Sequence, residues 1–264
     1  MSKQEQTHDL VRKAYGDVAR QQSSCCGPSA SCCSSKAYVA PDHPVPEAEL
    51  GLSCGNPVSF AQLREGDAVL DLGSGAGRDA FLAAQRVGPT GRVIGVDMTP
   101  EMLDLAARNA EKFKQSTGLA NVEFRRGQIE RLPVKDGEVN VVMSNCVINL
   151  SPDKPAVFRE AFRALRPGGR LLVSDIVLLR PLPESVRQSE ALYAACIAGA
   201  IGKQEYLKAI RDAGFAKVEI LTDHIYSSAE ACSDPVTSQV GAELEGAAAS
   251  ITVSAVKPGC CCGG

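Results

Sequence analysis

One stretch of the sequence constrains the fold more than any other. From Val69 to Gly77 it reads Val-Leu-Asp-Leu-Gly-Ser-Gly-Ala-Gly, so glycines at alternate positions directly follow a short apolar run. Glycine permits a tight turn and lets the backbone approach a ligand closely. A helix that begins after such a turn also offers free N–H donors. The stretch therefore predicts the strand, loop and helix of a nucleoside-binding α/β unit.

The chain beyond this loop alternates apolar strands with amphipathic helices, which is typical of βαβ units around a parallel sheet. Thr99 is the expected N-cap of the helix over 100–115, and Pro167-Gly168-Gly169 is expected to stop the helix over 154–165. The pattern predicts an α/β fold, a Rossmann-like, seven-stranded, mostly parallel sheet flanked by helices. We expect strands at 68–71, 92–97, 122–125, 138–144, 170–177, 218–222 and 250–256, and further helices at 8–20, 79–85, 186–200 and 204–213.

Composition changes along the chain divide it into segments. We expect an N-terminal helix and a flexible Cys-rich segment over 1–46, a ligand-binding core over 47–180, the C-terminal part of the fold over 181–257 and a Cys-rich tail over 258–264.

Composition and charge exclude several classes of function. The formal net charge is -3, so no basic stripe is available to neutralise the phosphates of a nucleic acid. No apolar run approaches the roughly 20 residues that a membrane span needs. The N-terminus lacks a secretory pattern, so we expect a cytoplasmic protein with a small-molecule partner.

Cysteine is unusually frequent. In a reducing cytoplasm such a set favours metal, metalloid or redox chemistry over a disulfide framework. The eleven are Cys25, Cys26, Cys32, Cys33, Cys54, Cys146, Cys196, Cys232, Cys260, Cys261 and Cys262. Cys232 has no motif around it and is interpreted as structural.

An acidic residue completes the predicted nucleoside-binding unit. Asp97 ends the strand that follows the glycine loop, where its oxygens can accept hydrogen bonds from both ribose hydroxyls. A nicotinamide dinucleotide is the main competitor, but its fingerprint spaces the glycines as G-x-G-x-x-G. Here the spacing is G-x-G-x-G after the acidic Asp71, which favours S-adenosylmethionine (SAM).

This arrangement resembles the class I SAM-dependent methyltransferase superfamily over most of residues 60–180. The turn over 165–169 and the stretch over 127–133, which resembles the adenine-contacting segment, extend the likeness. The resemblance implies SAM as methyl donor. The residues that it places at the cofactor are Asp71, Gly73, Ser74, Gly75, Gly77, Asp97, Met98, Ile129, Glu130 and Asn145.

The substrate is indicated by thiols. Oxygen and nitrogen nucleophiles usually need a base, yet none of the histidines, His8, His43 and His224, lies at a strand end near the glycine loop. Cys146 does follow a strand directly. As(III) fits this combination, because it prefers thiolate ligands and has a lone pair that attacks a methyl group without losing a proton.

Separate stretches also resemble the arsenite methyltransferase family: 51–57, 97–99, 144–154 and 194–200. The resemblance implies that Cys54, Cys146 and Cys196 bind As(III), and that Cys54 later helps to reduce the product. The 25/26 pair, with Cys26 favoured, is the implied disulfide partner of Cys54. The expected function is methyl transfer from SAM to thiol-bound As(III), a detoxification of arsenite and methylated arsenicals, with glutathione or thioredoxin as external reductant.

Other interpretations stay open. A methyltransferase for a small carbon, nitrogen or oxygen nucleophile would leave the cysteines as buried core residues and tolerate their replacement by serine. A protein that only sequesters metalloids would not need the intact glycine loop. Arsenic could also be only one of several trivalent metalloids that are bound, antimony among them. The terminal cysteines could capture arsenite and pass it inward, or could be dispensable.

Overall fold

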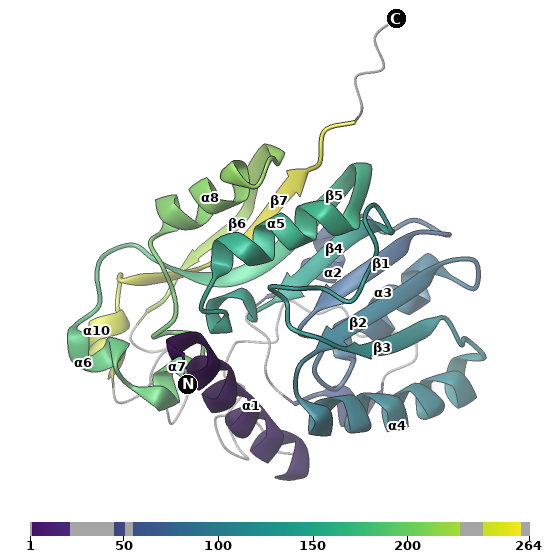
Figure 1. Cartoon of the computed structure of the whole chain (residues 1–264), viewed down its shortest axis with the longest axis horizontal. Helices are drawn as coiled ribbons and strands as arrows, with labels where there is room; N and C mark the ends of the chain where they lie inside the picture. The colour runs from purple at the N-terminus through teal and green to yellow at the C-terminus, as the bar shows by residue number, and fades with distance from the viewer. Residues whose placement is uncertain (1, 22–44, 51–54, 228–239, 260–264) are drawn as a thin grey trace, which may run out of the picture.

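The computed structural model describes residues 2–21, 45–50, 55–227 and 240–259. Their strands form a single sheet in the order β3-β2-β1-β4-β5-β7-β6 (Figure 1). β1 to β5 are parallel, and β7 is antiparallel to both β5 and β6. The strands are β1 (Ala68–Leu72), β2 (Arg92–Asp97), β3 (Val122–Arg126), β4 (Val139–Asn145), β5 (Leu165–Leu178), β6 (Ala216–Ile225) and β7 (Ala248–Val256). The predicted seven-stranded, mostly parallel sheet is confirmed.

Helices cover both faces of this sheet. α5 and α8 pack with the strands in one apolar cluster, whereas α3 and α4 pack in a second cluster on the opposite face. The helices are α1 (Lys3–Gln21), α2 (Pro57–Phe60), α3 (Arg78–Val87), α4 (Pro100–Thr117), α5 (Lys154–Ala164), α6 (Glu184–Arg187), α7 (Glu190–Ala194), α8 (Lys203–Asp212) and α10 (Gly241–Leu244), with 3-10 turns η2 (Pro46–Ala48) and η3 (Ile148–Leu150). The central strands β1 and β4 are therefore buried on both sides, as their apolar sequences require, whereas the edge strand β6 is largely exposed.

The predicted helix over 186–200 is wrong. Two short helices, α6 and α7, occupy part of this range, and the chain then turns at Cys196, whose φ is +64°. A left-handed backbone conformation cannot continue a right-handed helix. Cys196 therefore lies in a tight turn after α7 and not on a helix face.

One local expectation also needs correction, and a second is confirmed. α5 ends at Ala164, before the Pro-Gly-Gly sequence, because Leu165 already adopts an extended backbone and pairs with Val139 at the start of β5. Thr99 does occupy the N-cap of α4, but its side chain forms no capping hydrogen bond.

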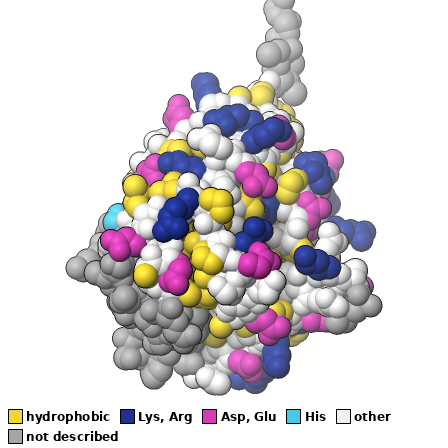
Figure 2. All heavy atoms as spheres, turned by 90° about the vertical axis from the view of Figure 1, so that its left-hand side faces the viewer, with side chains coloured by type: hydrophobic (Ala, Val, Ile, Leu, Met, Phe, Trp, Pro, Cys, Tyr) yellow, Lys and Arg dark blue, Asp and Glu magenta, His cyan; other side chains and the backbone are white. Residues whose placement is uncertain are grey.

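The outer face of the molecule is of mixed character. In Figure 2, hydrophobic side chains are interspersed with Lys, Arg, Asp and Glu on the face that forms the left-hand side of Figure 1. Among the described residues, no helix combines the length and the apolar character that a membrane crossing needs.

The strand order places a ligand-binding position between β1 and β4. From β1 the chain proceeds outward through β2 and β3, and then returns to the other side of β1 as β4. At such a switch point the loops after neighbouring parallel strands diverge and leave a crevice at their carboxyl ends. The glycine loop after β1 and the Cys146 segment after β4 therefore meet at this crevice.

Candidate active site

A cavity of about 990 Å³, part of which is open to solvent, lies at the carboxyl ends of β1, β2 and β4. The predicted cofactor residues that line it are Asp71, Gly73, Ser74, Gly75, Asp97, Met98, Ile129, Glu130 and Asn145. Gly77 lies outside the lining and serves the turn, because its φ is +96° and an added Cβ would lie 2.7 Å from the Phe81 ring.

The glycine loop passes close to the segment that carries Cys146. Gly73 has a φ of +65°, and a Cβ there would lie 2.2 Å from Cγ2 of Val147. A side chain at this position would displace Val147 and strain the backbone. The close approach explains why glycine is needed here, and it joins the two sides of the cavity directly.

Asp97 organises the same loop from β2. Its Oδ2 accepts a hydrogen bond from the Gly75 N–H at 3.0 Å, and its Oδ1 accepts one from the Thr99 N–H at 2.8 Å. Burial raises the pKa of Asp97, although these N–H donors oppose the rise. Each carboxylate oxygen has a further lone pair, so both can still accept a ribose hydroxyl.

Three acidic side chains, Asp71, Asp79 and Asp97, line this side of the cavity. Burial raises the pKa of Asp71 well above its usual value, and the nearby charges of Asp79 and Asp97 raise it further. Within the described structure, the buried Oδ2 of Asp71 has no hydrogen-bond partner. A ligand with positive charge would relieve this repulsion, whereas the diphosphate of a dinucleotide would increase it. A sulfonium and an ammonium group, both present in SAM, suit these residues.

Asn145 connects the cavity to the chain segment that follows Cys54. Its Nδ2 donates to the Gly55 carbonyl oxygen and to Oδ2 of Asp79, each at 2.9 Å, while its Oδ1 accepts from the Gly55 N–H at 3.2 Å. The side chain predicted to bind the cofactor thus also holds the Gly55 backbone. Cys54 itself and Cys26 lie outside the described residues.

Cys146 and Cys196 come together although they are 50 residues apart in sequence. The Cys196 thiol donates to the carbonyl oxygen of Cys146, with 2.6 Å between Sγ and O, and both residues are buried. Cys146 lines the cavity. Within the described ranges no group of three or more His, Cys, Asp or Glu side chains is placed to hold a metal ion. A three-thiolate set would therefore need a residue from outside those ranges.

Both cysteines adopt a backbone conformation that L-residues rarely adopt. Among the described residues other than glycine, positive φ occurs at Gln62, Cys146, Cys196 and Lys217. The left-handed region costs roughly 1–2 kcal/mol for a residue with a Cβ. Such strain is concentrated at functional positions, where the surrounding packing holds it in place.

A buried polar network, which the sequence did not reveal, lies next to the cysteines. Asp175 accepts hydrogen bonds from Tyr206 Oη at 3.1 Å and from Asn149 Nδ2 at 2.9 Å. Burial raises the pKa of Asp175 to about 7, although the Tyr206 bond and the charge of Lys154 oppose the rise. The Lys154 ammonium donates to the carbonyl oxygens of Asn149 and Ser151, so it secures the η3 turn that follows Cys146.

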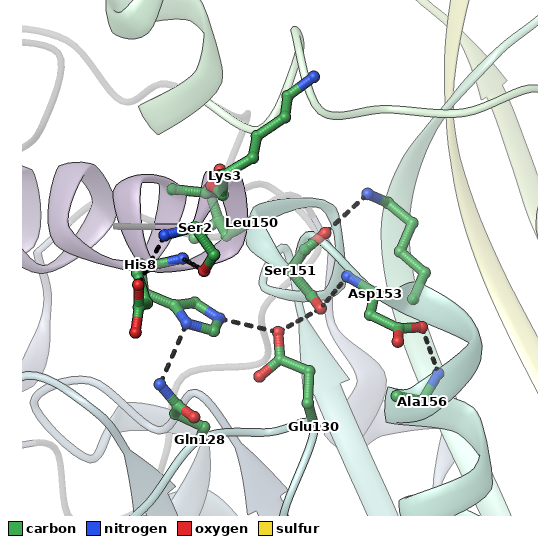
Figure 3. Close-up of polar contacts among 12 residues, drawn as sticks. Ser2, Lys3, His8, Gln128, Glu130, Leu150, Ser151, Asp153 and Ala156 are labelled. Carbon is green, nitrogen blue, oxygen red and sulfur yellow. Dashed lines mark hydrogen bonds and ion pairs between the residues drawn. The ribbon is translucent and has the colours of Figure 1, made fainter.

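His8 also lies at the site, although the sequence did not indicate this position. α1 brings it to the cavity, where its Nε2 lies 3.1 Å from Oε1 of Glu130 and its Nδ1 lies 3.1 Å from Nε2 of Gln128 (Figure 3). The Ser151 hydroxyl donates to the same Glu130 oxygen. His8 is separated from these partners by 120 residues or more, so no local motif could reveal the contact.

Comparison with known proteins agrees with this geometry. Residues 63–214 match the family model described as a methyltransferase domain. The chain is 45% identical over 234 residues to an arsenite methyltransferase of Halobacterium salinarum, a match that covers 82% of this chain and 59% of that protein. It is 41% identical to an arsenite methyltransferase of Aquipseudomonas alcaligenes, with 82% of this chain and 64% of that protein covered.

A solved structure extends the comparison to three dimensions. The X-ray structure of an arsenic(III) S-adenosylmethionine methyltransferase from Chlamydomonas reinhardtii matches with a TM-score of 0.70 and 40% identity, over 82% of this chain and 71% of that one. This chain spans less than two thirds of the length of each of the two microbial relatives named above. Sequence, fold and cavity together place the chain in the arsenite methyltransferase family of the SAM-dependent methyltransferases.

Proposed function

We propose that this protein transfers methyl groups from SAM to As(III) held by cysteine thiolates. The observation that carries the proposal is the pairing of Cys146 with Cys196 beside a cavity lined by carboxylates. Trivalent arsenic is soft and prefers thiolate ligands in a pyramid. Cys146, which lines the cavity, and the buried Cys196 in contact with it would provide two such ligands once the disulfide that Cys146 forms in this structure is reduced.

Cys54 is the proposed third thiolate. It is peptide-bonded to Gly55, whose N–H and carbonyl oxygen both bond to the Asn145 side chain next to Cys146. Cys26 is proposed as its later disulfide partner.

The cavity residues would bind and orient the methyl donor. Asp97 would accept the ribose hydroxyls, Ile129 and Glu130 would lie beside the adenine, and Asp71 with Asp79 would face the positive charges of the ligand. When bound, SAM supplies an electrophilic methyl group and leaves as S-adenosylhomocysteine. The apolar side chains of Val147 and Leu150 in the same cavity would keep water from the reacting atoms.

The methyl transfer itself needs no base, but the return of arsenic to the trivalent state needs thiols. The lone pair of arsenic forms the new As–C bond while the S–C bond of the sulfonium breaks, so no proton has to leave the nucleophile. Arsenic is formally oxidised from the trivalent to the pentavalent state. Two thiols then return it to the trivalent state as they form a disulfide, and glutathione or thioredoxin would reduce that disulfide.

A methyltransferase assay with arsenite, SAM and excess thiol tests the proposal. The parent chain and Cys146→Ser are compared by separating methylated arsenicals from arsenite, with S-adenosylhomocysteine affinity measured for both. Methylated arsenic from the parent and none from a variant with unchanged nucleoside affinity is the expected result. A folded, SAM-binding parent that methylates no arsenic would refute the proposal and favour a small carbon, nitrogen or oxygen nucleophile.

A further inference from the structure

One face of α1 forms part of the cavity wall. His8, Val11 and Tyr15 all line the cavity, and their spacing of three and four residues places them in a row on the helix. The row covers about two turns of α1. The two ends of the row contact different parts of the site.

The His8 end contacts the nucleoside side of the cavity, which consists of the glycine loop, Asp97 and the segment 127–130. Gln128 and Glu130, which contact the imidazole, belong to the segment after β3, and Ile129 and Glu130 line the cavity. In Figure 3 the His8 ring lies between Gln128 and Glu130, and Ser151 approaches Glu130 from the other side. A ligand that orders this segment would therefore also hold the N-terminal half of α1.

The Tyr15 end contacts the thiol side of the site, which consists of Cys146, Cys196 and the turns that carry them. The Tyr15 hydroxyl donates to the carbonyl oxygen of Ala194, the last residue of α7, at 3.1 Å. Ala194 is two residues before Cys196. Val11, between the two ends of the row, packs in the same buried cluster as Cys146 and Cys196.

The two helices differ in what supports them. α1 is also fixed to the nucleoside side by the ion pair of Arg20 with Glu101 on α4, next to Gly16. α7 has five residues, and its N-cap bond from Leu192 N–H to the Ser189 hydroxyl is long, at 3.3 Å. Short helices have little stability of their own, so contacts with the rest of the protein decide the position of α7.

We propose that α1 is a strut that couples occupancy of the nucleoside cavity to the position of Cys196, with His8 and Tyr15 as positioning residues at its two ends. The inference deepens the proposed function and rests on it, because that function makes the nucleoside cavity and Cys196 parts of one site. Ligand binding that holds Glu130 and His8 stabilises α1, and Tyr15 then stabilises α7. Such coupling is reciprocal, so arsenic bound at Cys196 also favours nucleoside binding.

Hydrogen exchange of the full chain, with and without saturating S-adenosylhomocysteine, tests the strut without arsenic. The reporter amides are those of Ala195, Cys196 and Ile197, which donate to carbonyl oxygens of α7. In the parent, the ligand should slow their exchange. Tyr15→Phe keeps the ring but loses the hydroxyl, so ligand-induced protection of these amides should fall roughly three- to tenfold.

Further variants test the His8 end of α1 independently of the Tyr15 end. His8→Ala should weaken S-adenosylhomocysteine binding roughly three- to tenfold, and His8→Gln should restore part of that loss because an amide can still donate and accept. Lys13→Ala, on the exposed face of α1, is the matched control and should change neither readout.

The possible failures are distinguishable. A parent that does not bind S-adenosylhomocysteine would refute the proposed function, and the strut with it. A parent that binds the nucleoside but shows no protection at 195–197 would overturn the strut alone. Full protection retained in Tyr15→Phe would also overturn it, because the Ala194 contact would then transmit nothing.

Discussion

The nucleoside side and the thiol side of the cavity are built in different ways. The glycine loop and Asp97 come from one continuous βαβ unit, and the Gly75 N–H donates to the Asp97 carboxylate. Cys146 and Cys196 come from separate segments, and each has a positive φ. The first side is therefore specified by local chain geometry, whereas the second depends on tertiary packing to hold strained turns together.

This difference predicts different responses to substitution. Changes on the nucleoside side should mainly affect ligand affinity, because the loop is already organised by its own backbone; Gly73, which contacts Val147 of the thiol side, is the exception. Changes on the thiol side and at its support should affect stability and the geometry of the turns. The four variants below test this distinction, from the largest expected effect to the smallest.

Asp97→Ala should weaken SAM binding roughly 100- to 1000-fold, because two charge-assisted hydrogen bonds to ribose hydroxyls would be lost. Calorimetric titration with SAM measures the loss. Asp104→Ala, an exposed carboxylate on the adjacent helix α4, is the matched control. An Asp97→Ala variant that binds SAM within threefold of the parent would show that this carboxylate does not contact the ligand.

Gly73→Ala should lower the free energy of unfolding by about 2–4 kcal/mol, since it adds a clash with Val147 to a left-handed backbone. Gly118→Ala is the control, because Gly118 has a φ of +74° and open space around it, so only a backbone cost of about 1 kcal/mol is expected. Urea denaturation measures both. If the added Val147→Ala substitution does not restore part of the loss, the contact between the two sides is not the cause.

Asp175→Asn tests the support of the thiol side through pH. The pKa of Asp175 is raised from 3.8 to about 7 in the folded protein, mainly by burial. Between these values the folded state binds a proton that the unfolded chain has released, so this group's stabilising contribution is lost as the pH rises toward 7.

The parent should therefore lose about 2–3 kcal/mol relative to Asp175→Asn between pH 5 and pH 8. Denaturation curves of both proteins across this range measure the difference. A constant difference would mean that Asp175 does not titrate there. Asp212→Asn changes an exposed carboxylate on α8 that pairs with Lys208, and it should leave the pH profile unchanged.

Ser189→Ala should have the smallest effect, about 0.5–1 kcal/mol, because it removes the N-cap hydrogen bond of α7. The effect should be local: hydrogen exchange should accelerate in α7 and in the Cys196 turn but not in β1 or β2. Uniform acceleration throughout the chain would mean that the thiol side is no less stable than the nucleoside side.

The sequence predicted the nucleoside side well because its signals are local. The glycine spacing and Asp97 lie within one βαβ unit, and the bounds of β2 match the prediction. The shared arsenic site of Cys54, Cys146 and Cys196, implied by resemblance, stays a prediction, and the expected helix through Cys196 was wrong. The contact of His8 with Glu130 and the network around Asp175 join residues from distant segments, so neither a spacing nor a period in the sequence indicates them.

The most direct test of the central claim is a double-mutant cycle on the two thiols. Rates of arsenite methylation are measured for the parent, Cys146→Ser, Cys196→Ser and the double variant, with S-adenosylhomocysteine affinity as the control. If both thiols hold one arsenic as a unit, each single variant should lose at least about 100-fold and the double variant little more. Losses that multiply, or a single variant within threefold of the parent, would contradict a shared arsenic site.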